Sequence, residues 1–333
     1  MTRVDLVYSA AALAALALNR AQPVSAVQEP QAPTALPEVV VTADRYPVRA
    51  DSVAATITVL TGDDLRAQGI RFLGDALRQV PGVQVIQNGS YGAATSLFLR
   101  GGQSDYVKVL IDGIPANQPG GSYDFSALST DNVERIEVLR GPASVIYGSD
   151  AVTGVVHVIT RGGRDLQGVG GQAAEVDALL EGGTYDSFRW EGAARGDLGP
   201  VEWSGSVSRF TTDGAYEFNN RFRNTVASAL IRARPGASSE VTLSGRWTDG
   251  RFQFPTDFTG AVVDRNQFAT NKELTVSLDA AHRVLPSLEA RLVAGRYESD
   301  IASDDRPDPP PGPTSLSLRD ADLGRWSADV RLV

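Results

Sequence analysis

The chain contains no cysteine and only two histidines, His157 and His282. Without cysteine it cannot form disulfides, thiolate metal sites, a cysteine nucleophile or a lipid-modified cysteine. Two histidines leave little material for a zinc site or a histidine-based catalytic triad. The Walker A, G-x-S-x-G and H-E-x-x-H patterns are also missing from the sequence. These absences argue against an enzyme and favour binding or transport.

Positive charge is scarce as well. The sequence has 31 Lys and Arg against 40 Asp and Glu, which gives a formal net charge of -9. Because a nucleic-acid-binding protein needs a basic face for the phosphates, no nucleic-acid partner is expected. The dinucleotide-like pattern GVGGQA at residues 168–173 has no strand before it and no helix after it, as that fingerprint requires. No cofactor is therefore predicted.

The apolar run at residues 7–18 is too short to cross a bilayer as a helix, which needs about 20 residues. Arg3 precedes it and the small residues at positions 24–26 follow it, as in a secretory signal. We predict a signal peptide at residues 1–26. The Pro-rich segment that follows is typical of an extended linker, so residues 27–50 are predicted to form a tether.

Residues 97–162 contain two β-rich blocks with glycines at positions where the backbone must turn. The pair Asp112-Gly113 between apolar runs is the strongest short-range hairpin signal. The blocks LFLRGGQSDYVKVLIDGIPAN and VERIEVLRGPASVIYGSDAVTGVVHVITRG resemble the plug domain of TonB-dependent outer-membrane receptors, and the resemblance extends over residues 37–165. It implies an α+β plug domain at residues 51–165 that fills a transmembrane β-barrel and gates nutrient uptake.

Two short helices are predicted within the plug. Thr61 can cap a helix, with Asp64 three residues later in an arrangement like a capping box. Residues 72–80 place apolar side chains at helical spacing, and the Pro-Gly pair after them ends that helix. These positions are expected to be core and to have no function.

The run PEVVVTADR at residues 37–45 is rich in β-branched residues and has no local strand to pair with. A strand-forming segment on a tether can add itself to the sheet edge of another protein. The run resembles the TonB box, the segment that the energy-coupling protein TonB grasps; the alternative is a first strand of the plug. The predicted box consists of Glu38, Val39, Val40, Val41, Thr42 and Ala43.

After about residue 171, segments of roughly ten residues alternate apolar and polar side chains, as transmembrane β-strands do. Clear examples are residues 187–195, 241–249, 273–280 and 325–333. A soluble β-sandwich would alternate in the same way. We count about eight such strands, all antiparallel, in residues 172–333.

Turn lengths favour the membrane alternative. Tight connections are predicted at residues 197–200, 234–237 and 284–287, and long ones at residues 212–221, 250–271 and 299–322. Short periplasmic turns and long outer loops are the habit of outer-membrane barrels. An eight-stranded barrel is too narrow to hold a plug, whereas transporters with roughly 22 strands have the lumen for one. Residues 172–333 are therefore expected to be the first part of a larger barrel.

Two Gly-rich loops, residues 87–94 and 117–125, are the candidate ligand-binding apices of the plug. Glycines let backbone donors approach a bulky ligand, and tyrosines offer flat amphipathic surface. The segment QNGSYGAATSLFLRG resembles the cobalamin transporter branch, which makes cobalamin the leading substrate and a ferric siderophore the alternative. The predicted ligand-binding residues are Asn88, Ser90, Tyr91, Asn117, Gln118, Tyr123 and Asp124.

Charged residues recur in the plug motifs. The resemblance implies that they contact residues facing the barrel lumen, with Arg189, Glu191 and Arg246 as plausible partners. The predicted contact residues of the plug are Arg100, Arg135, Glu137 and Arg140. The outer loops offer acidic residues where the cobalamin branch holds calcium, but too sparsely for six to eight oxygen ligands. No metal site is predicted from Asp213, Glu217, Asp249 and Asp257.

The sequence thus predicts an active transporter spanning the outer membrane of a Gram-negative bacterium several times. Its partners would be TonB, outer-membrane lipid, and cobalamin or a ferric siderophore, with the plug and TonB box reached from the periplasm. A secreted β-rich binding or adhesin module is the alternative of a different class. Soluble strands would not keep Trp and Leu on one outer face over eight consecutive segments. An outer-membrane enzyme is a third alternative, but no nucleophile and base pair supports it.

Overall fold

The computed structural model describes residues 40–41, 48–49, 56–162, 174–257, 259–309 and 316–333. The predicted signal peptide and the segment 168–173 lie outside the described residues, as do residues 38–39 and 42–43 of the predicted TonB box. No helix in the described part of the chain has the length and apolar character that a membrane span requires.

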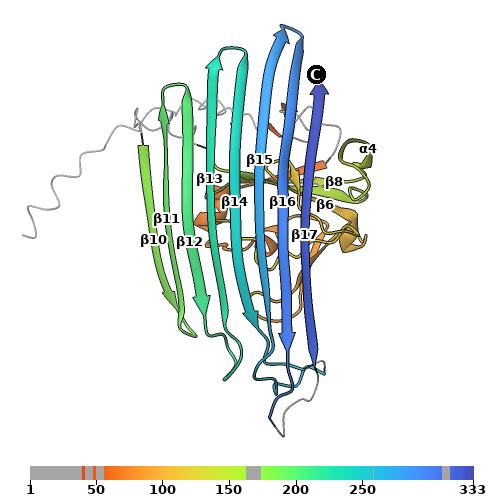
Figure 1. The fold of residues 1–333 in the computed structure, drawn as a ribbon, viewed down its shortest axis with the longest axis vertical. Helices are drawn as coiled ribbons and strands as arrows, with labels where there is room; N and C mark the ends of the chain where they lie inside the picture. The colour runs from red at the N-terminus through yellow and green to blue at the C-terminus, as the bar shows by residue number, and fades with distance from the viewer. Residues whose placement is uncertain (1–39, 42–47, 50–55, 163–173, 258, 310–315) are drawn as a thin grey trace, which may run out of the picture. The chain divides into compact units, whose positions relative to one another are not determined.

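The plug domain, here residues 56–162, is built on a five-stranded sheet of order β3-β8-β9-β6-β7 (orange to yellow-green in Figure 1). The sheet is mixed, because β6 and β9 run parallel and its other neighbours run antiparallel. Strands β4 and β5 form a separate antiparallel pair. The bounds are β3 Thr56–Thr61, β4 Val83–Gln87, β5 Thr95–Leu99, β6 Val107–Ile111, β7 Ile114–Pro115, β8 Val133–Arg140 and β9 Gly154–Thr160.

Short helices complete the plug: α2 Gly62–Ala67, α3 Leu73–Leu77, the 3-10 helix η2 Ser104–Tyr106, and α4 Ser144–Tyr147. The predicted cap is confirmed, since Thr61 Oγ1 accepts a hydrogen bond of 3.2 Å from the backbone N–H of Asp64. The helix predicted at residues 72–80 is shorter as α3, because the chain tightens into i→i+3 hydrogen bonds up to Val80.

The predicted hairpin at Asp112-Gly113 is confirmed. Ile111 pairs with Ile114, so the two residues between them form the whole loop, and both have positive φ angles of 47° and 82°. This is the geometry of a type I′ turn, which Asp-Gly favours. The Gly113 N–H donates to Nε2 of His157 on β9 at 2.9 Å, which ties the turn to the neighbouring strand.

One local prediction is wrong. The run at residues 37–45 was expected to have no local strand to pair with, but β1 Val40–Val41 pairs antiparallel with β2 Val48–Arg49. The pairing involves only two residues on each strand. So short a ladder contributes little stability on its own, because an isolated two-stranded hairpin is marginal in water.

Residues 174–332 form an antiparallel sheet of eight strands in sequence order (green to blue in Figure 1), which confirms the predicted number. Strands β10 and β17 are its two edges. The bounds are β10 Ala174–Gly183, β11 Ser187–Leu198, β12 Val201–Thr212, β13 Phe222–Gly236, β14 Ser239–Gln253, β15 Phe268–Leu285, β16 Leu288–Asp305 and β17 Ser317–Leu332.

The predicted alternation of turn lengths is also confirmed. Residues 199–200, 237–238 and 286–287 connect strands at one end of the sheet, the short-turn end. Longer connections at the other end, the long-loop end, are residues 213–221, 254–267 and 306–316. Two of these are shorter than predicted because the flanking strands extend further. The connection between β10 and β11, residues 184–186, is short although it lies at the long-loop end.

Protonation of His157 should weaken the plug. Burial lowers the pKa of His157, and Arg135 acts in the same direction, while the carboxylates of Glu137, Asp112 and Asp279 offset part of the effect. The unfolded chain takes up this proton below about pH 6.5 and the folded plug only at lower pH, so stability falls as pH falls from about 6.5.

We therefore expect the urea midpoint of plug unfolding to drop between pH 7.5 and 5.5, read by mass spectrometry after a hydrogen-exchange pulse at one fixed pH. His157→Gln, which keeps an acceptor for Gly113, should flatten this dependence. His282→Gln is the matched control, because it removes the other, exposed histidine. Equal pH dependence in the His157 variant and the parent would contradict the assignment.

Candidate functional site

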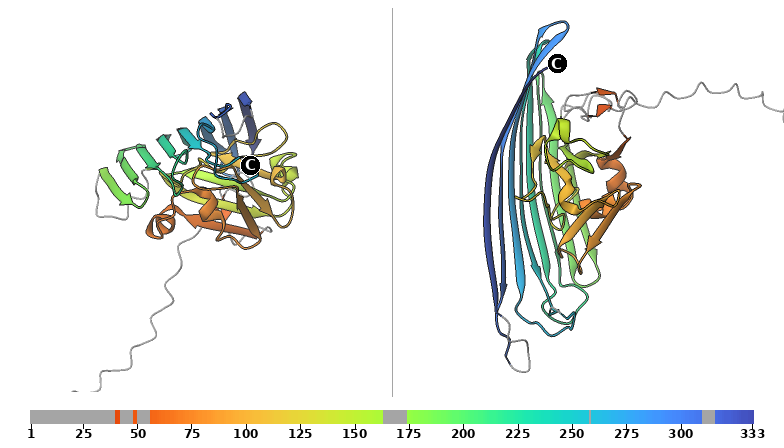
Figure 2. Two further views of the ribbon diagram at one scale, coloured as in Figure 1. Left: turned by 90° about the horizontal axis from the view of Figure 1, so that it is seen from below. Right: turned by 90° about the vertical axis from the view of Figure 1, so that its right-hand side faces the viewer.

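The plug lies against the concave side of the large sheet (Figure 2), and the contact joins mainly polar groups. Strands have a period of two, so alternate side chains of each strand face the plug. On β12, Ser204, Ser206 and Ser208 are buried on this plug-facing side. Further buried plug-facing residues are Ser228, Ser244, Arg246, Thr248, Glu273, Thr275 and Ser277.

An aromatic cluster forms the contact nearest the long-loop end. Phe72 of the plug lies 6.0 Å from the ring of Phe210 and 5.8 Å from that of Phe222. Tyr91 joins them, 5.2 Å from Phe210 in an edge-on arrangement. Gly92 follows at φ 81°, and a Cβ there would collide with Phe222 and Phe252. The residues 87–94 loop can therefore approach the sheet only because this position is glycine.

The same loop is hydrogen-bonded to a long loop of the sheet, because Asn220 Nδ2 donates to Ser90 Oγ at 2.9 Å. Tyr91 keeps 41% of its surface exposed although its ring touches the cluster. Asn88 is exposed as well. The structure therefore brings Asn88, Ser90 and Tyr91 together at the long-loop end, which is where the sequence placed a plug apex.

The second predicted apex, residues 117–125, is different. Asn117 is fully buried and binds its own loop, since its amide donates to Val107 O and Gly121 O and accepts from the Val109 N–H. Tyr123 is only 5% exposed. The expectation that these two side chains form an exposed tip is wrong, because they satisfy buried polar groups.

Tyr123 instead joins the plug to the sheet. Its hydroxyl donates to Glu273 Oε2 of β15 at 2.9 Å, and Asn271 donates to the other carboxylate oxygen at 3.1 Å. Burial, together with the neighbouring Glu273 carboxylate, raises the pKa of Tyr123 well above its usual range, so the phenol stays a donor. A hydrogen bond to a charged acceptor contributes about 1.5–3 kcal/mol.

The two remaining residues of that loop are half-buried. Asp124 accepts hydrogen bonds from the backbone N–H groups of Thr95 at 2.9 Å and Ser126 at 3.0 Å. Burial raises the pKa of Asp124, and these two donors offset part of that rise. The backbone N–H of Gln118 closes the loop by donating to Ser122 O at 2.7 Å.

Asp131 is the centre of the charged contact. Its carboxylate accepts from Arg189 and from Ser208 Oγ, each at 2.6 Å, and its backbone carbonyl accepts from Arg246 at 2.9 Å. Arg246 also donates to the carbonyl of Ser129 at 2.8 Å and is 3% exposed. A buried pair of this kind is costly to break, about 3–5 kcal/mol, when one partner alone is removed.

A third polar contact lies closer to the middle of the strands. Asp112 Oδ2 accepts from Ser244 Oγ of β14 at 2.7 Å, and its backbone carbonyl accepts from Ser277 Oγ of β15 at 2.8 Å. The same carboxylate accepts from the Thr160 hydroxyl within the plug at 2.8 Å. The hairpin turn is therefore also a docking element.

The predicted contact residues of the plug bind elsewhere. Arg135 pairs with Glu137 at 2.8 Å, and Arg140 donates to Pro81 O at 2.7 Å and to Thr58 Oγ1 at 3.0 Å, all within the plug. Arg100 is exposed. In the described chain these residues do not supply the contacts with the sheet that were predicted for them, because Arg135, Glu137 and Arg140 lie on β8, between β3 and β9.

The predicted partners on the sheet are better placed. Arg189 and Arg246 reach Asp131, and Glu191 lies 2.9 Å from Arg189. Sequence reasoning missed Asp131 and Ser129 of the plug. The available signal was the polar run STDN at residues 129–132, which interrupts an otherwise apolar stretch immediately before β8.

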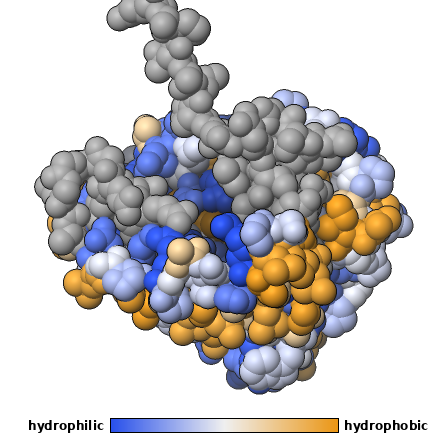
Figure 3. Space-filling view, turned by 90° about the horizontal axis from the view of Figure 1, so that it is seen from above, coloured by the Kyte–Doolittle hydropathy of each residue, from blue (hydrophilic) through white to orange (hydrophobic). Residues whose placement is uncertain are grey.

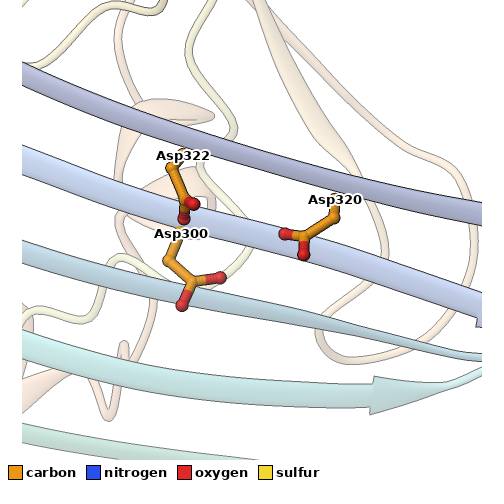
Figure 4. Close-up of side chains that lie close together, drawn as sticks. All are labelled: Asp300, Asp320 and Asp322. Carbon is orange, nitrogen blue, oxygen red and sulfur yellow. The ribbon is translucent and has the colours of Figure 1, made fainter.

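The acidic loop residues make local contacts. Asp213 pairs with Arg221 at 3.1 Å, and Asp257 accepts from the hydroxyl and the backbone N–H of Thr259 at 2.6 and 2.8 Å. In the part of the chain that is described, one group of three carboxylates has oxygens within 4.8 Å of one another: Asp300, Asp320 and Asp322 (Figure 4). They come from the exposed ends of β16 and β17, and Asp300 also lies 3.8 Å from Lys272.

Comparison with known proteins follows the same lines. The sequence model of the TonB-dependent Receptor Plug Domain matches residues 49–155. The chain is 32% identical over 231 residues to the Vitamin B12 transporter BtuB of Photobacterium profundum, an alignment that covers 66% of this chain and 36% of that protein. The chain thus spans about a third of the length of this relative.

Solved structures share the fold. The pyoverdine-bound receptor FpvA of P. aeruginosa superposes with a TM-score of 0.67 at 16% identity, covering 88% of this chain and 41% of that one. The siderophore receptor PiuA of Acinetobacter baumannii gives a TM-score of 0.67 at 17% identity, covering 86% and 43%. Both contain a domain that superposes on this plug together with strands that superpose on this sheet.

Proposed function

We propose that this chain, which belongs to the TonB-dependent receptor family, is part of an outer-membrane transporter that actively imports a scarce, large nutrient. The observation that carries the proposal is a sheet with two unlike sides. Its plug-facing side is lined by serine, threonine and charged residues, and its outward side is apolar. A sheet of this kind suits a wall between lipid and a plugged, watery lumen.

The tryptophans support the membrane side of the proposal. All four in the chain lie in the large sheet, and each is adjacent in sequence to a residue whose side chain bonds the plug. Because strands alternate, each tryptophan points the other way, as in the aromatic girdles of outer-membrane barrels. They are Trp190, Trp203, Trp247 and Trp326.

Large aliphatic side chains share this outward side. Ile231 of β13, Leu243 of β14 and Val330 of β17 are 50%, 49% and 74% exposed. In the end-on view of Figure 3, hydrophobic residues follow the lower margin of the molecule, whereas hydrophilic ones lie nearer its middle. So much exposed apolar surface is unusual for a soluble monomer and favours a lipid environment over a secreted adhesin.

The nature of the plug contact suits a part that must move. The contacts at Tyr123, Asp131 and Asp112 are hydrogen bonds and ion pairs to hydroxyl, carboxylate and guanidinium groups. Water can replace each of them, so the net cost of opening one neutral hydrogen bond is only about 0.5–1.5 kcal/mol. A pull on the N-terminal tether by TonB would therefore displace the plug without exposing a large apolar interface.

Cobalamin is the substrate we propose. It is supported by the similarity to a vitamin B12 transporter and by the loop at residues 87–94, where Asn88, Ser90 and Tyr91 gather. A ferric siderophore is the second candidate, supported by the siderophore receptors that share the fold. Gln118 and Asp124 belong to the same proposed ligand-binding surface. We assign no catalytic residue.

The first test concerns energy coupling. Deleting residues 39–42 in the full-length protein should abolish uptake of radiolabelled cobalamin and leave cobalamin binding nearly unchanged, because the run lies on a tether outside the binding surface. Deleting residues 31–34 from the Pro-rich linker is the matched control and should leave uptake intact. Transport at the parental rate after loss of residues 39–42 would remove the TonB-box assignment.

The second test concerns the ligand. Tyr91→Ala should weaken cobalamin binding by about 1–3 kcal/mol, as expected for an aromatic anchor held by neighbouring rings. Tyr106→Ala is the control, because that tyrosine of the plug is equally exposed, at 40%. Isothermal titration of the parent and both variants decides between the outcomes. Equal affinities would remove the loop from the site, and a parent that binds a ferric siderophore but no cobalamin would change the substrate.

A further inference from the structure

Arginines gather on the outward side of the large sheet, next to the long loops. Phe210, Phe222 and Phe252 are buried on the plug-facing side of β12, β13 and β14. Because side chains alternate, the adjacent residues Arg209, Arg223 and Arg251 point outward. With Arg221 from the neighbouring loop they line a surface hollow of about 340 Å³, which we call the arginine pocket.

Two of these arginines are unfavourably placed by themselves. Arg223 and Arg251 are direct cross-strand partners in the β13–β14 ladder. Like charges that lie directly opposite each other destabilise a sheet, whereas an anion bound between them would reverse the sign of the interaction. In the described chain no carboxylate forms an ion pair with either guanidinium.

The arginine pocket has few internal counter-charges. Its one carboxylate, Asp213, pairs with Arg221 at 3.1 Å. Asp249 lies two residues from Arg251 on the same outward side. Arg209 donates to Thr225 Oγ1 at 3.2 Å, and the Arg251 guanidinium stacks 3.8 Å from the centre of the Phe268 ring. These contacts hold two cationic groups in place without neutralising them.

A second, apolar hollow continues from the arginine pocket toward the short-turn end. It has a volume of about 690 Å³ and is shaped by small side chains on the same three strands and their neighbours. Val207 at its edge is two residues from Arg209, about 7 Å along an extended strand. We call it the small-residue groove. Its floor includes Gly192, Gly205, Ala227, Ala229 and Gly245.

We propose that the arginine pocket and the small-residue groove together bind one phosphate-bearing lipid of the surrounding bilayer. The inference rests on the membrane placement in the proposed function. Guanidinium groups bind phosphate oxygens in a bidentate manner, and each basic residue near an anionic lipid surface contributes about 1 kcal/mol. An acyl chain lying in the groove would cover apolar surface that glycine and alanine leave open.

Binding can be measured by native mass spectrometry of the full-length protein in detergent, titrated with diphosphoryl lipid A. The Arg223→Gln/Arg251→Gln variant should bind about 30-fold more weakly than the parent, which corresponds to about 2 kcal/mol. The control Arg283→Gln/Arg319→Gln removes the same charge from exposed arginines outside the pocket and should stay within about twofold of the parent. Equal affinities for the two double variants would overturn the proposal.

The groove and the source of the phosphate are tested separately. Ala229→Phe adds a ring on the exposed floor of the groove and should weaken lipid binding several-fold; unchanged binding would overturn the groove as the acyl site. Inorganic phosphate titrated in place of the lipid should bind far more weakly. Equal affinity for inorganic phosphate would show a free-anion site and overturn the lipid assignment.

Lipid binding is read without transport, so the two proposals can fail independently. A parent protein that binds the lipid as expected but imports no nutrient would contradict the proposed function alone. A parent that imports its nutrient, with no loss of lipid affinity in the arginine variant, would contradict this inference alone.

Discussion

The strict two-residue alternation along the strands of the large sheet is the constraint on which the rest of the structure depends. It places Ser204, Ser208 and Arg246 against the plug while Trp203 and Trp247 face away from it. A slip of one residue in any strand would exchange the two sides and put tryptophan into a polar contact. The register shifts at residues 233–236 and 283–285 lie at the short-turn end, away from these plug contacts.

The two sides of the sheet meet different requirements. On the plug-facing side, hydroxyl and charged groups hold the plug in one place, yet water can substitute for them when it moves. Asp131 is the strictest contact, because it satisfies two arginines and a serine at once. On the outward side there is no such exchange, so the surface is either apolar or, near the long loops, suited to anionic groups.

Local signals in the sequence predicted local structure well. Asp112-Gly113, the Thr61 cap and the eight alternating strands depend on turn chemistry, capping and periodicity, which act over a few residues. The plug–sheet contacts depend on which strand of one domain faces which strand of the other. Arg135 was therefore predicted to leave the plug although it pairs with Glu137, while Asp131 was missed. Tyr123 has the composition of an exposed loop tip, and only its three-dimensional position shows it buried.

The central claim is that the plug must break its polar contacts with the sheet for transport. Asn132 Nδ2 of the plug donates to Ser228 Oγ of β13 at 2.9 Å, and the chain has no cysteine of its own. Asn132→Cys/Ser228→Cys in the full-length protein therefore places one cross-link across the contact. The account predicts normal ligand binding and no uptake when oxidised, with uptake restored by a reductant. Uptake at the parental rate by the oxidised, cross-linked protein would contradict it.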